Sequence, residues 1–346
     1  DQPRSRGLGD VYKRQVVFYT LNTFVHFSFL NTAASPAGIA VIHSLFNIGA
    51  TILLFPFANL LEKMAILAIP DKGSEVEEME EEKINPDLAR LDERFLDKPG
   101  FAMEECRGVA INMARKSKKA MNLAIDLLKE YDEKTSARVE KLENQIDQYE
   151  DALGTYLVKL SERDLSVKDS RILSVLLHCI GDFERISDHA VNIRDAAVEM
   201  NKKNLQFSDK AKQELLVFSN AIRDIIDRAV LAFETGDTGL AKEVEPLEQV
   251  VDALNKEEKQ RHINRLRTGT CTIELGFVLS DISTNFERAA DHCSNIAVCL
   301  LQVDEGGFDT HEYLDILKEE NSEEFRHEYM ELSEKYTLPE SKHGGK

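Results

Sequence analysis

Four pairs of acidic residues share a spacing that could hold a metal ion. In each pair a glutamate precedes an aspartate by four positions, which places both carboxylates on one face of a helix. Carboxylates that face each other at short range repel unless they are protonated or bridged by a cation. An all-oxygen site favours hard or borderline ions such as Mg, Mn, Fe or Ca. The pairs are Glu143 and Asp147, Glu184 and Asp188, Glu248 and Asp252, and Glu287 and Asp291.

The alternative interpretation is that these pairs simply face water, because the chain is acidic throughout. It has 62 Asp and Glu residues against 43 Lys and Arg residues, a net charge of −19. That charge argues against a nucleic-acid-binding protein, which neutralises phosphates with basic residues. Two of the four pairs, however, follow directly after apolar residues, so we expect them at the rim of a helix interface. These apolar residues are Leu142, Ile146, Leu247 and Val251.

Histidine, asparagine and arginine side chains accompany the acids. His189 and His292 follow an aspartate directly, so helix geometry rotates each of them by about 100° from that carboxylate. We therefore expect them to support the metal ligands or to pack, rather than to bind the metal. Asn192 and Asn295 continue the acidic stripe by one further turn and are candidates for the same supporting role. The arginines after two of the glutamates, Arg185 and Arg288, are predicted salt-bridge partners.

An internal repeat carries all of these residues. The pattern F-E-R-x-x-D-H-x-x-N-I occurs at 183–193 and again at 286–296, and the other two acid pairs precede it at nearly equal offsets. Such self-similarity is typical of duplicated structural units. Apolar residues recur at helical spacing, so we predict an all-α domain of two three-helix units. The predicted helices are 101–132, 135–161, 167–203, 208–235, 238–267 and 270–302.

Enzymatic function is not predicted. The sequence has no phosphate-binding G-x-x-x-x-G-K-[ST] loop, no G-x-S-x-G motif and no H-E-x-x-H motif. The Glu-x-x-His spacing of di-iron oxidases occurs only near the C-terminus, at Glu324 with His327 and Glu340 with His343. The five cysteines are scattered and form no C-x-x-C pair. They predict neither a disulfide framework nor a zinc site, and place most of the chain in reducing cytosol.

The N-terminal part has a different composition. From Val16 to Leu61 there is no Asp, Glu, Lys or Arg, which is enough for two membrane passes, predicted at 16–34 and 37–61. His43 and Asn47 lie on one face of the second pass and are candidates for a transport path. The alternative is that they make an interhelical hydrogen bond. Residues 10–15 read like a translated sequencing adapter, so residues 1–15 are predicted to be an artefact. The alternative is a genuine polar N-terminal tail.

The duplicated unit, with its E-x-x-x-D pairs and F-E-R-x-x-D-H-x-x-N-I blocks, resembles the PhoU family of phosphate-responsive regulators over residues 95–302. The segment AVIHSLFN at 40–47 is similar to the end of the membrane domain of bacterial sodium-dependent phosphate cotransporters, which often carry a PhoU-like domain. These resemblances imply the following division of the chain: the end of a transmembrane transporter domain (16–70), an acidic linker (71–94), PhoU-like repeats at 95–204 and 205–302, and a charged tail (303–346) with a helix near 311–335 and a frayed end.

The same resemblances imply a function. The chain would be a fragment of a multi-pass protein of the cell membrane that transports inorganic phosphate with sodium as the coupling ion. Its cytoplasmic PhoU-like domain would regulate transport and bind a divalent or multinuclear metal (Fe, Mn, Zn or Mg) at the eight carboxylates. Partners would be phosphate, sodium, membrane lipid and a second copy or a signalling protein. The Q-S-S-S transport motifs of that family are absent from this sequence. The alternative is a membrane-tethered PhoU-like regulatory adaptor that transports nothing.

Overall fold

The structure, a computed structural model, describes residues 85–305 and 323–339, and these contain helices but no strand. This confirms the predicted all-α class. Two short 3-10 helices, η3 and η4, precede the first long helix. The elements are η3 (Leu88–Arg90), η4 (Glu93–Asp97), α4 (Pro99–Lys129), α5 (Glu133–Ser161), α6 (Val167–Lys203), α7 (Asp209–Thr235), α8 (Thr238–Lys242), α9 (Val244–Arg267), α10 (Ile273–Glu305) and α12 (Glu323–Lys335).

Local side-chain chemistry sets the ends of the long helices. The side chains of Asp132, Ser166 and Ser208 each accept a hydrogen bond from a backbone N–H in the first turn of α5, α6 and α7. Such caps satisfy donors that the helix itself cannot pair. Asn204 and Gly236 end α6 and α7 in the left-handed conformation, with φ of 52° and 68°. The helices therefore begin and end close to the predicted breaks.

One predicted helix is divided in two. The segment predicted at 238–267 forms α8 and α9, which are separated at Glu243. Pro246 is the physical reason, because it has no backbone N–H and its ring clashes with the carbonyl four residues earlier. That carbonyl belongs to Lys242, the last residue of α8.

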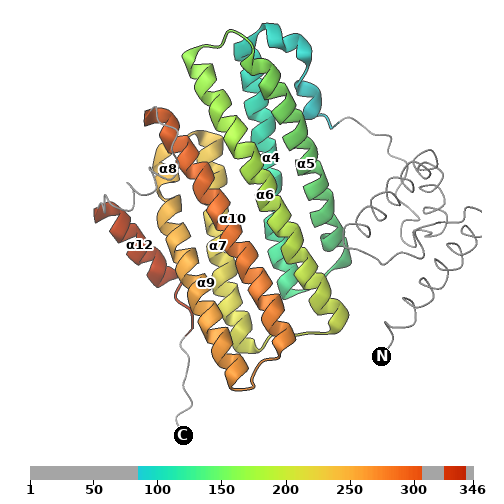
Figure 1. Ribbon diagram of the computed structural model, residues 1–346, viewed down its shortest axis with the longest axis vertical. Helices are drawn as coiled ribbons and strands as arrows, with labels where there is room; N and C mark the ends of the chain where they lie inside the picture. Colours follow the sequence, from blue (N-terminus) through green and yellow to red (C-terminus); the bar gives the residue numbers. More distant parts are fainter. Residues whose placement is uncertain (1–84, 306–322, 340–346) are drawn as a thin grey trace, which may run out of the picture. The chain divides into compact units, whose positions relative to one another are not determined.

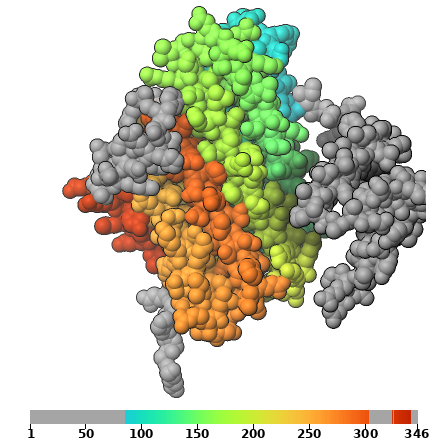
Figure 2. Space-filling view, viewed as in Figure 1, coloured from blue at the N-terminus to red at the C-terminus, as the bar shows by residue number. Residues whose placement is uncertain are grey.

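The helices form two three-helix repeats, α4, α5 and α6 in the first and α7, α9 and α10 in the second, as the duplication predicts. Helices α6 and α10 run side by side along the middle of the bundle (Figure 1), and Figure 2 shows the same two helices meeting along the visible face. They are antiparallel, because Lys203 near the end of α6 pairs with Glu274 near the start of α10 at 2.7 Å. One hydrophobic core includes side chains from both repeats.

Segments flanking the repeats pack against them. At the N-terminal side, η3 and η4 span the end of the predicted linker and the first residues of the predicted first repeat. Leu96 is buried there, and the backbone carbonyl of Asp92 accepts a hydrogen bond from Tyr156 on α5 at 2.9 Å. At the C-terminal side, α12 contacts α9, and the prediction of a frayed end after residue 335 needs correction for the described residues 336–339. Tyr336 and Leu338 are buried. Removing their apolar surface from water stabilises this end of the described chain.

The predicted multi-pass membrane localisation also needs correction. None of the helices that the structure describes combines the length and the apolar character that crossing a bilayer requires. They are amphipathic, with one buried face and one charged face, as expected for packing in a bundle. For this part of the chain the prediction is wrong. The two predicted spans and the transport-path candidates His43 and Asn47 lie outside the described residues.

Candidate metal centre

Four of the predicted ligands come together in the first repeat, at the interface of α5 and α6. We call Glu143, Asp147, Glu184 and Asp188 the first carboxylate cluster. Each glutamate directly follows a buried apolar residue, Leu142 on α5 and Phe183 on α6. This register turns the carboxylates to the rim of the interface, where Glu143, Glu184 and Asp188 are half-buried and Asp147 is exposed.

These acids shift each other's pKa. Burial, followed by the negative charge of Asp188, raises the pKa of Glu184 to about 7, and the two carboxyls share a hydrogen bond. Burial, with the charges of Asp147 and Asp188, also raises the pKa of Glu143. A carboxyl that keeps its proton near neutral pH because it is buried and another acid lies beside it can exchange that proton for a cation.

Arg185 partly compensates this negative charge. Its guanidinium lies 3.5 Å from Glu184 and 3.8 Å from Asp188, so its predicted role as a salt-bridge partner is confirmed. The side chain is 62% exposed, and exposed pairs of this kind are screened by water and contribute little. The cluster therefore remains a site of mutual repulsion.

A further acid, Glu150, lies near the first cluster and was not among the predicted ligands. Burial raises its pKa, with contributions from the charges of Asp151 and Asp147, and it contributes to the raised pKa of Glu184. The signal in the sequence was its spacing, because Glu150 continues the stripe of Glu143 and Asp147 by one more turn of α5.

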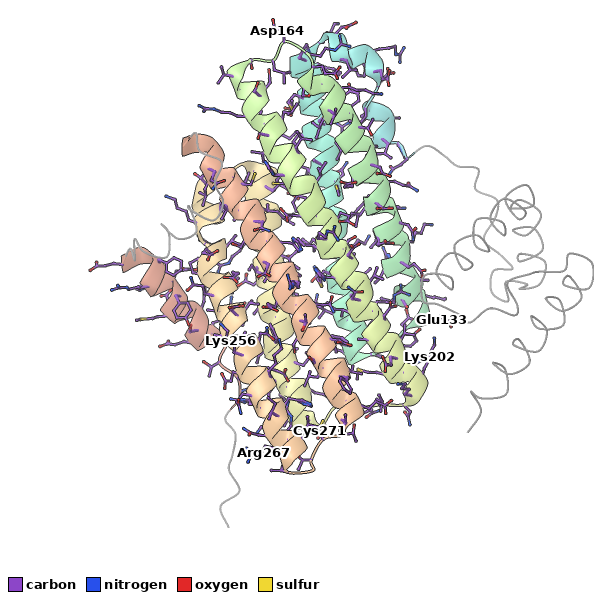
Figure 3. The ribbon with its side chains drawn as sticks, in the orientation of Figure 1. Glu133, Asp164, Lys202, Lys256, Arg267 and Cys271 are labelled. Carbon is purple, nitrogen blue, oxygen red and sulfur yellow. The ribbon has the colours of Figure 1, made fainter. Side chains whose placement is uncertain are left out.

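The second repeat forms an equivalent group between α9 and α10, the second carboxylate cluster of Glu248, Asp252, Glu287 and Asp291. Burial, then the charge of Glu287 and more weakly that of Asp252, raises the pKa of Asp291. Here a lysine takes part as well. The Nζ atom of Lys256 (Figure 3) lies 3.0 Å from Asp252 Oδ2, and the charges of Glu248 and Glu287 help to raise the pKa of Lys256.

The ligand types of the two clusters suit a metal ion, but the present positions of the side chains do not. Each collects carboxylate oxygens from two helices, the ligand type that hard and borderline divalent ions prefer. Among the described residues, no group of three or more acidic, histidine or cysteine side chains is arranged so that it could hold an ion as it stands. Binding would therefore require the carboxylates to change rotamer, including exposed Asp147 in the first cluster.

The histidines and asparagines lie at the interface between the repeats. His189 Nδ1 on α6 lies 2.8 Å from Asn285 Oδ1 on α10, and His292 Nδ1 on α10 lies 2.8 Å from Asp182 Oδ1 on α6. The two imidazole rings stack at 5.6 Å between centroids. Burial lowers the pKa of His189, against the opposing effect of its hydrogen bond. We call these four residues the inter-repeat clasp.

Two asparagines extend the clasp. Asn192 donates a hydrogen bond to Asn285 at 3.0 Å, and Asn295 donates one to Asp182 at 3.4 Å. Sequence analysis missed Asp182 and Asn285, although both directly precede the F-E-R blocks at equivalent positions of the two repeats. A polar residue at the same place in both copies was the available signal.

Comparison with known proteins agrees with the duplicated architecture. A family model described as PhoU domain matches residues 110–197 and 215–300, one match in each repeat. The chain is 23% identical over 188 residues to "Phosphate-specific transport system accessory protein PhoU homolog 1" of Thermotoga maritima, covering 54% of this chain and 80% of the relative. It is 23% identical over 219 residues to the PhoU homolog of Pseudomonas aeruginosa, covering 63% and 90%.

Two solved structures share the fold. The crystal structure of PhoU from Pseudomonas aeruginosa aligns with a TM-score of 0.56 and 22% identity, covering 59% of this chain and 97% of that one. The phosphate transport system regulatory protein PhoU from Streptococcus pneumoniae aligns with a TM-score of 0.55 and 17% identity, covering 61% and 99%. Each alignment therefore includes nearly the whole of the solved protein.

Proposed function

This chain belongs to the PhoU domain family, and on that premise we propose that it regulates phosphate transport and binds divalent metal at its two carboxylate clusters. The observation that carries the regulatory role is the family match, which includes both repeats. The two curated relatives described above are named accessory proteins of a phosphate-specific transport system. A regulator of phosphate uptake is the function that this similarity supports best.

The same relatives favour the alternative prediction over the main one. They are accessory proteins by name, so they support a regulator without transport activity of its own, and the sodium-coupled carrier is not proposed further. They are likewise not described as enzymes, which agrees with the prediction that the chain is not an enzyme.

The metal-binding part of the proposal is supported by the electrostatics of the clusters. Glu143, Glu184 and Asp188 would hold an ion between α5 and α6, with Asp147 and Glu150 in reach. The four acids of the second carboxylate cluster would do so between α9 and α10. A bound cation supplies the positive charge that ends the repulsion between neighbouring carboxylates. In the second cluster it must also displace Lys256 from Asp252.

Metal binding is tested on the full chain purified without chelator. We expect bound Fe, Mn, Zn or Mg by elemental analysis, and binding of added Mn²⁺ by calorimetry. The double variant Glu184→Gln with Asp188→Asn should lose binding at the first cluster. Glu133→Gln, an exposed acid at the start of the same α5 (Figure 3), is the matched control and should bind as the wild type does. A folded wild-type chain that neither carries nor binds metal would contradict the proposal.

The regulatory role is tested in bacteria that lack their own PhoU. Labelled phosphate uptake is measured with and without expression of this chain, and the amount of folded protein is confirmed in each culture. We expect the uptake rate to change when the chain is present. An unchanged rate with the folded protein present would rule out regulation of that transport system.

A further inference from the structure

Two cysteines meet across the interface between the repeats. Cys179 on α6 is fully buried and Cys299 on α10 is half-buried, and both are free thiols. Their opposition follows from the antiparallel register of the two helices. Asp182 accepts a hydrogen bond from Asn295, and one further turn along both helices in the same direction leads to Cys179 and Cys299. Helical faces repeat at three- and four-residue spacing, so the two thiols face each other.

The neighbouring Cys179 thiol lowers the pKa of Cys299, while Cys299 and complete burial raise the pKa of Cys179. A thiolate is the nucleophilic form of cysteine. The pair therefore combines a half-buried cysteine whose thiolate is stabilised with a fully buried thiol beside it. This arrangement is typical of redox-sensing cysteines with a resolving partner.

We propose that Cys299 and Cys179 form a peroxide-reactive site whose oxidation links the two repeats by a disulfide bond. The oxidant is a hydroperoxide, with hydrogen peroxide as the simplest member of the class. Cys299 is the residue that reacts first, because it is the less buried of the two. Cys179 is the residue that resolves the oxidised form.

The reaction has two balanced steps. The Cys299 thiolate attacks one peroxide oxygen, the O–O bond breaks, and the sulfur becomes a sulfenic acid while the second oxygen leaves as water after taking up a proton. Cys179 then attacks the Cys299 sulfur, the S–S bond forms and the S–O bond breaks, and the departing hydroxide takes the Cys179 proton. Two thiols and one peroxide give one disulfide and two waters.

The remaining cysteines of the described residues are placed differently. Cys106 and Cys293 are fully buried, and burial raises the pKa of both. Cys271 lies in the turn between α9 and α10 (Figure 3), where its sulfur is 3.9 Å from His262 Nδ1. Cys271 is thus the accessible cysteine without a thiol partner across the interface, and it serves as the internal comparison.

The experiment exposes the reduced full chain to hydrogen peroxide, blocks the remaining thiols and maps the peptides by mass spectrometry without reduction. We expect a Cys179–Cys299 peptide pair that is two hydrogens lighter than the sum of the reduced peptides and that separates on reduction. Cys299→Ser should abolish this pair, and Cys271→Ser, the matched control, should leave it unchanged. Oxidation of Cys271 with Cys179 and Cys299 still reduced would overturn the proposal.

A second variant tests the order of events. In Cys179→Ala the sulfenic acid on Cys299 has no resolving partner, so dimedone should label Cys299 more strongly than in the wild-type chain. Circular dichroism confirms that this variant is folded. If it is not, the half-buried Cys299→Ser variant and the wild-type peptide map still decide the question. A wild-type chain that forms disulfides only between molecules would refute the intramolecular link.

Discussion

In the folded chain, Glu184 is held in a position that disfavours its ionised form. Its register places it directly after fully buried Phe183, and its neighbour on the same helix face is Asp188. Folding thus removes the carboxyl from water and brings it beside a second acid, and both effects disfavour its ionised form. A bound cation would reverse the second effect, which links the proposed metal site to the stability of α5 and α6.

This repulsion makes the stability of the metal-free chain depend on pH. The pKa of Glu184 is raised from 4.5 to about 7 in the folded state. Between these values the folded state binds more protons than the unfolded state, so stability falls as pH rises and then levels off above about 7. With chelator present, Glu184→Gln should be more stable than the wild type at pH 8 by about 1 kcal/mol after allowance for screening. Below pH 4 this difference should disappear.

Urea unfolding at a series of pH values measures this effect. Glu133→Gln makes the same substitution at an exposed position, and at pH 8 it should not raise the stability as Glu184→Gln does. A Glu184→Gln variant that is less stable than the wild type at pH 8 would show that the carboxyl is stabilised rather than strained.

At the scale of elements, a buried ionic group joins α7 to α9. Glu214 on α7 is fully buried, and it accepts hydrogen bonds from Arg261 at 2.9 Å and from Arg265. Arg265 also contacts Glu258 at 3.2 Å, and Glu258 accepts a hydrogen bond from Ser283 on α10 at 3.0 Å. This network crosses all three helices of the second repeat, so each of its charges depends on the others.

Removing Glu214 should therefore cost far more than removing an exposed acid with the same partner. Glu214→Ala leaves Arg261 without a buried counter-ion and leaves Arg265 with Glu258 as its one buried partner. We therefore expect a loss of about 3–5 kcal/mol in unfolding free energy. Glu257 also pairs with Arg261, at 2.6 Å, but is exposed, so Glu257→Ala should cost less than about 1 kcal/mol. Equal losses in chemical denaturation would contradict the assignment.

Helix α12 holds to the second repeat through one buried face. Leu332 is 3% exposed, whereas Met330 on the same helix is 63% exposed. Arg228 on α7 reaches Glu328 at 2.9 Å, and Lys335 reaches Asp224 at 2.9 Å. The contacts indicate that apolar burial, fixed in register by ion pairs, holds α12 in place.

Truncating the buried side chain should release α12. Leu332→Ala is expected to cost about 2–4 kcal/mol and to accelerate amide hydrogen exchange in α12, while Met330→Ala should change stability by less than about 0.5 kcal/mol. Exchange followed by mass spectrometry separates release of the helix from global unfolding. Similar protection of α12 in both variants would mean that Leu332 does not anchor it.

At the scale of the whole molecule, the two repeats share one core. Phe183 of the first repeat meets Phe233 of the second edge-to-face, at 4.9 Å between ring centroids. The inter-repeat clasp spans the same boundary with hydrogen bonds. Neither repeat can separate without exposing apolar surface of the other, and this favours cooperative unfolding.

We therefore expect the two repeats to unfold in a single thermal transition. Differential scanning calorimetry should give a calorimetric enthalpy equal to the van't Hoff enthalpy for the helical repeats. Phe233→Ala removes a ring that packs against Phe183 of the other repeat. It should lower the free energy of unfolding by about 3–5 kcal/mol, and the chain should still unfold in one transition. Two separate transitions in the wild-type chain would show that the repeats are independent units.

Much of the architecture was predictable because its signals are local. Helix caps such as Ser166 and Ser208, and the break before the second repeat, act within a few residues of the chain, so sequence patterns locate them. Pro246 was also recognisable in the sequence. Whether it would divide the predicted helix depended on the balance between the lost hydrogen bond and the stability of the remaining helix, which the sequence pattern does not give. The buried end at Tyr336 and Leu338 was missed, because its partners lie on helices far away in the sequence.

The sequence alone determined the helical periodicity, the duplication and the register of the four E-x-x-x-D pairs, because each depends on spacing along one helix. The tertiary structure decided which side chains face one another. In the tertiary structure, His189 and His292 contact each other between the repeats. Lys256 lies among the acids of the second cluster, and Cys179 lies opposite Cys299. These pairings arise from how α6 and α10 pack, and packing between distant segments depends on the shapes of whole helix faces rather than on any local pattern.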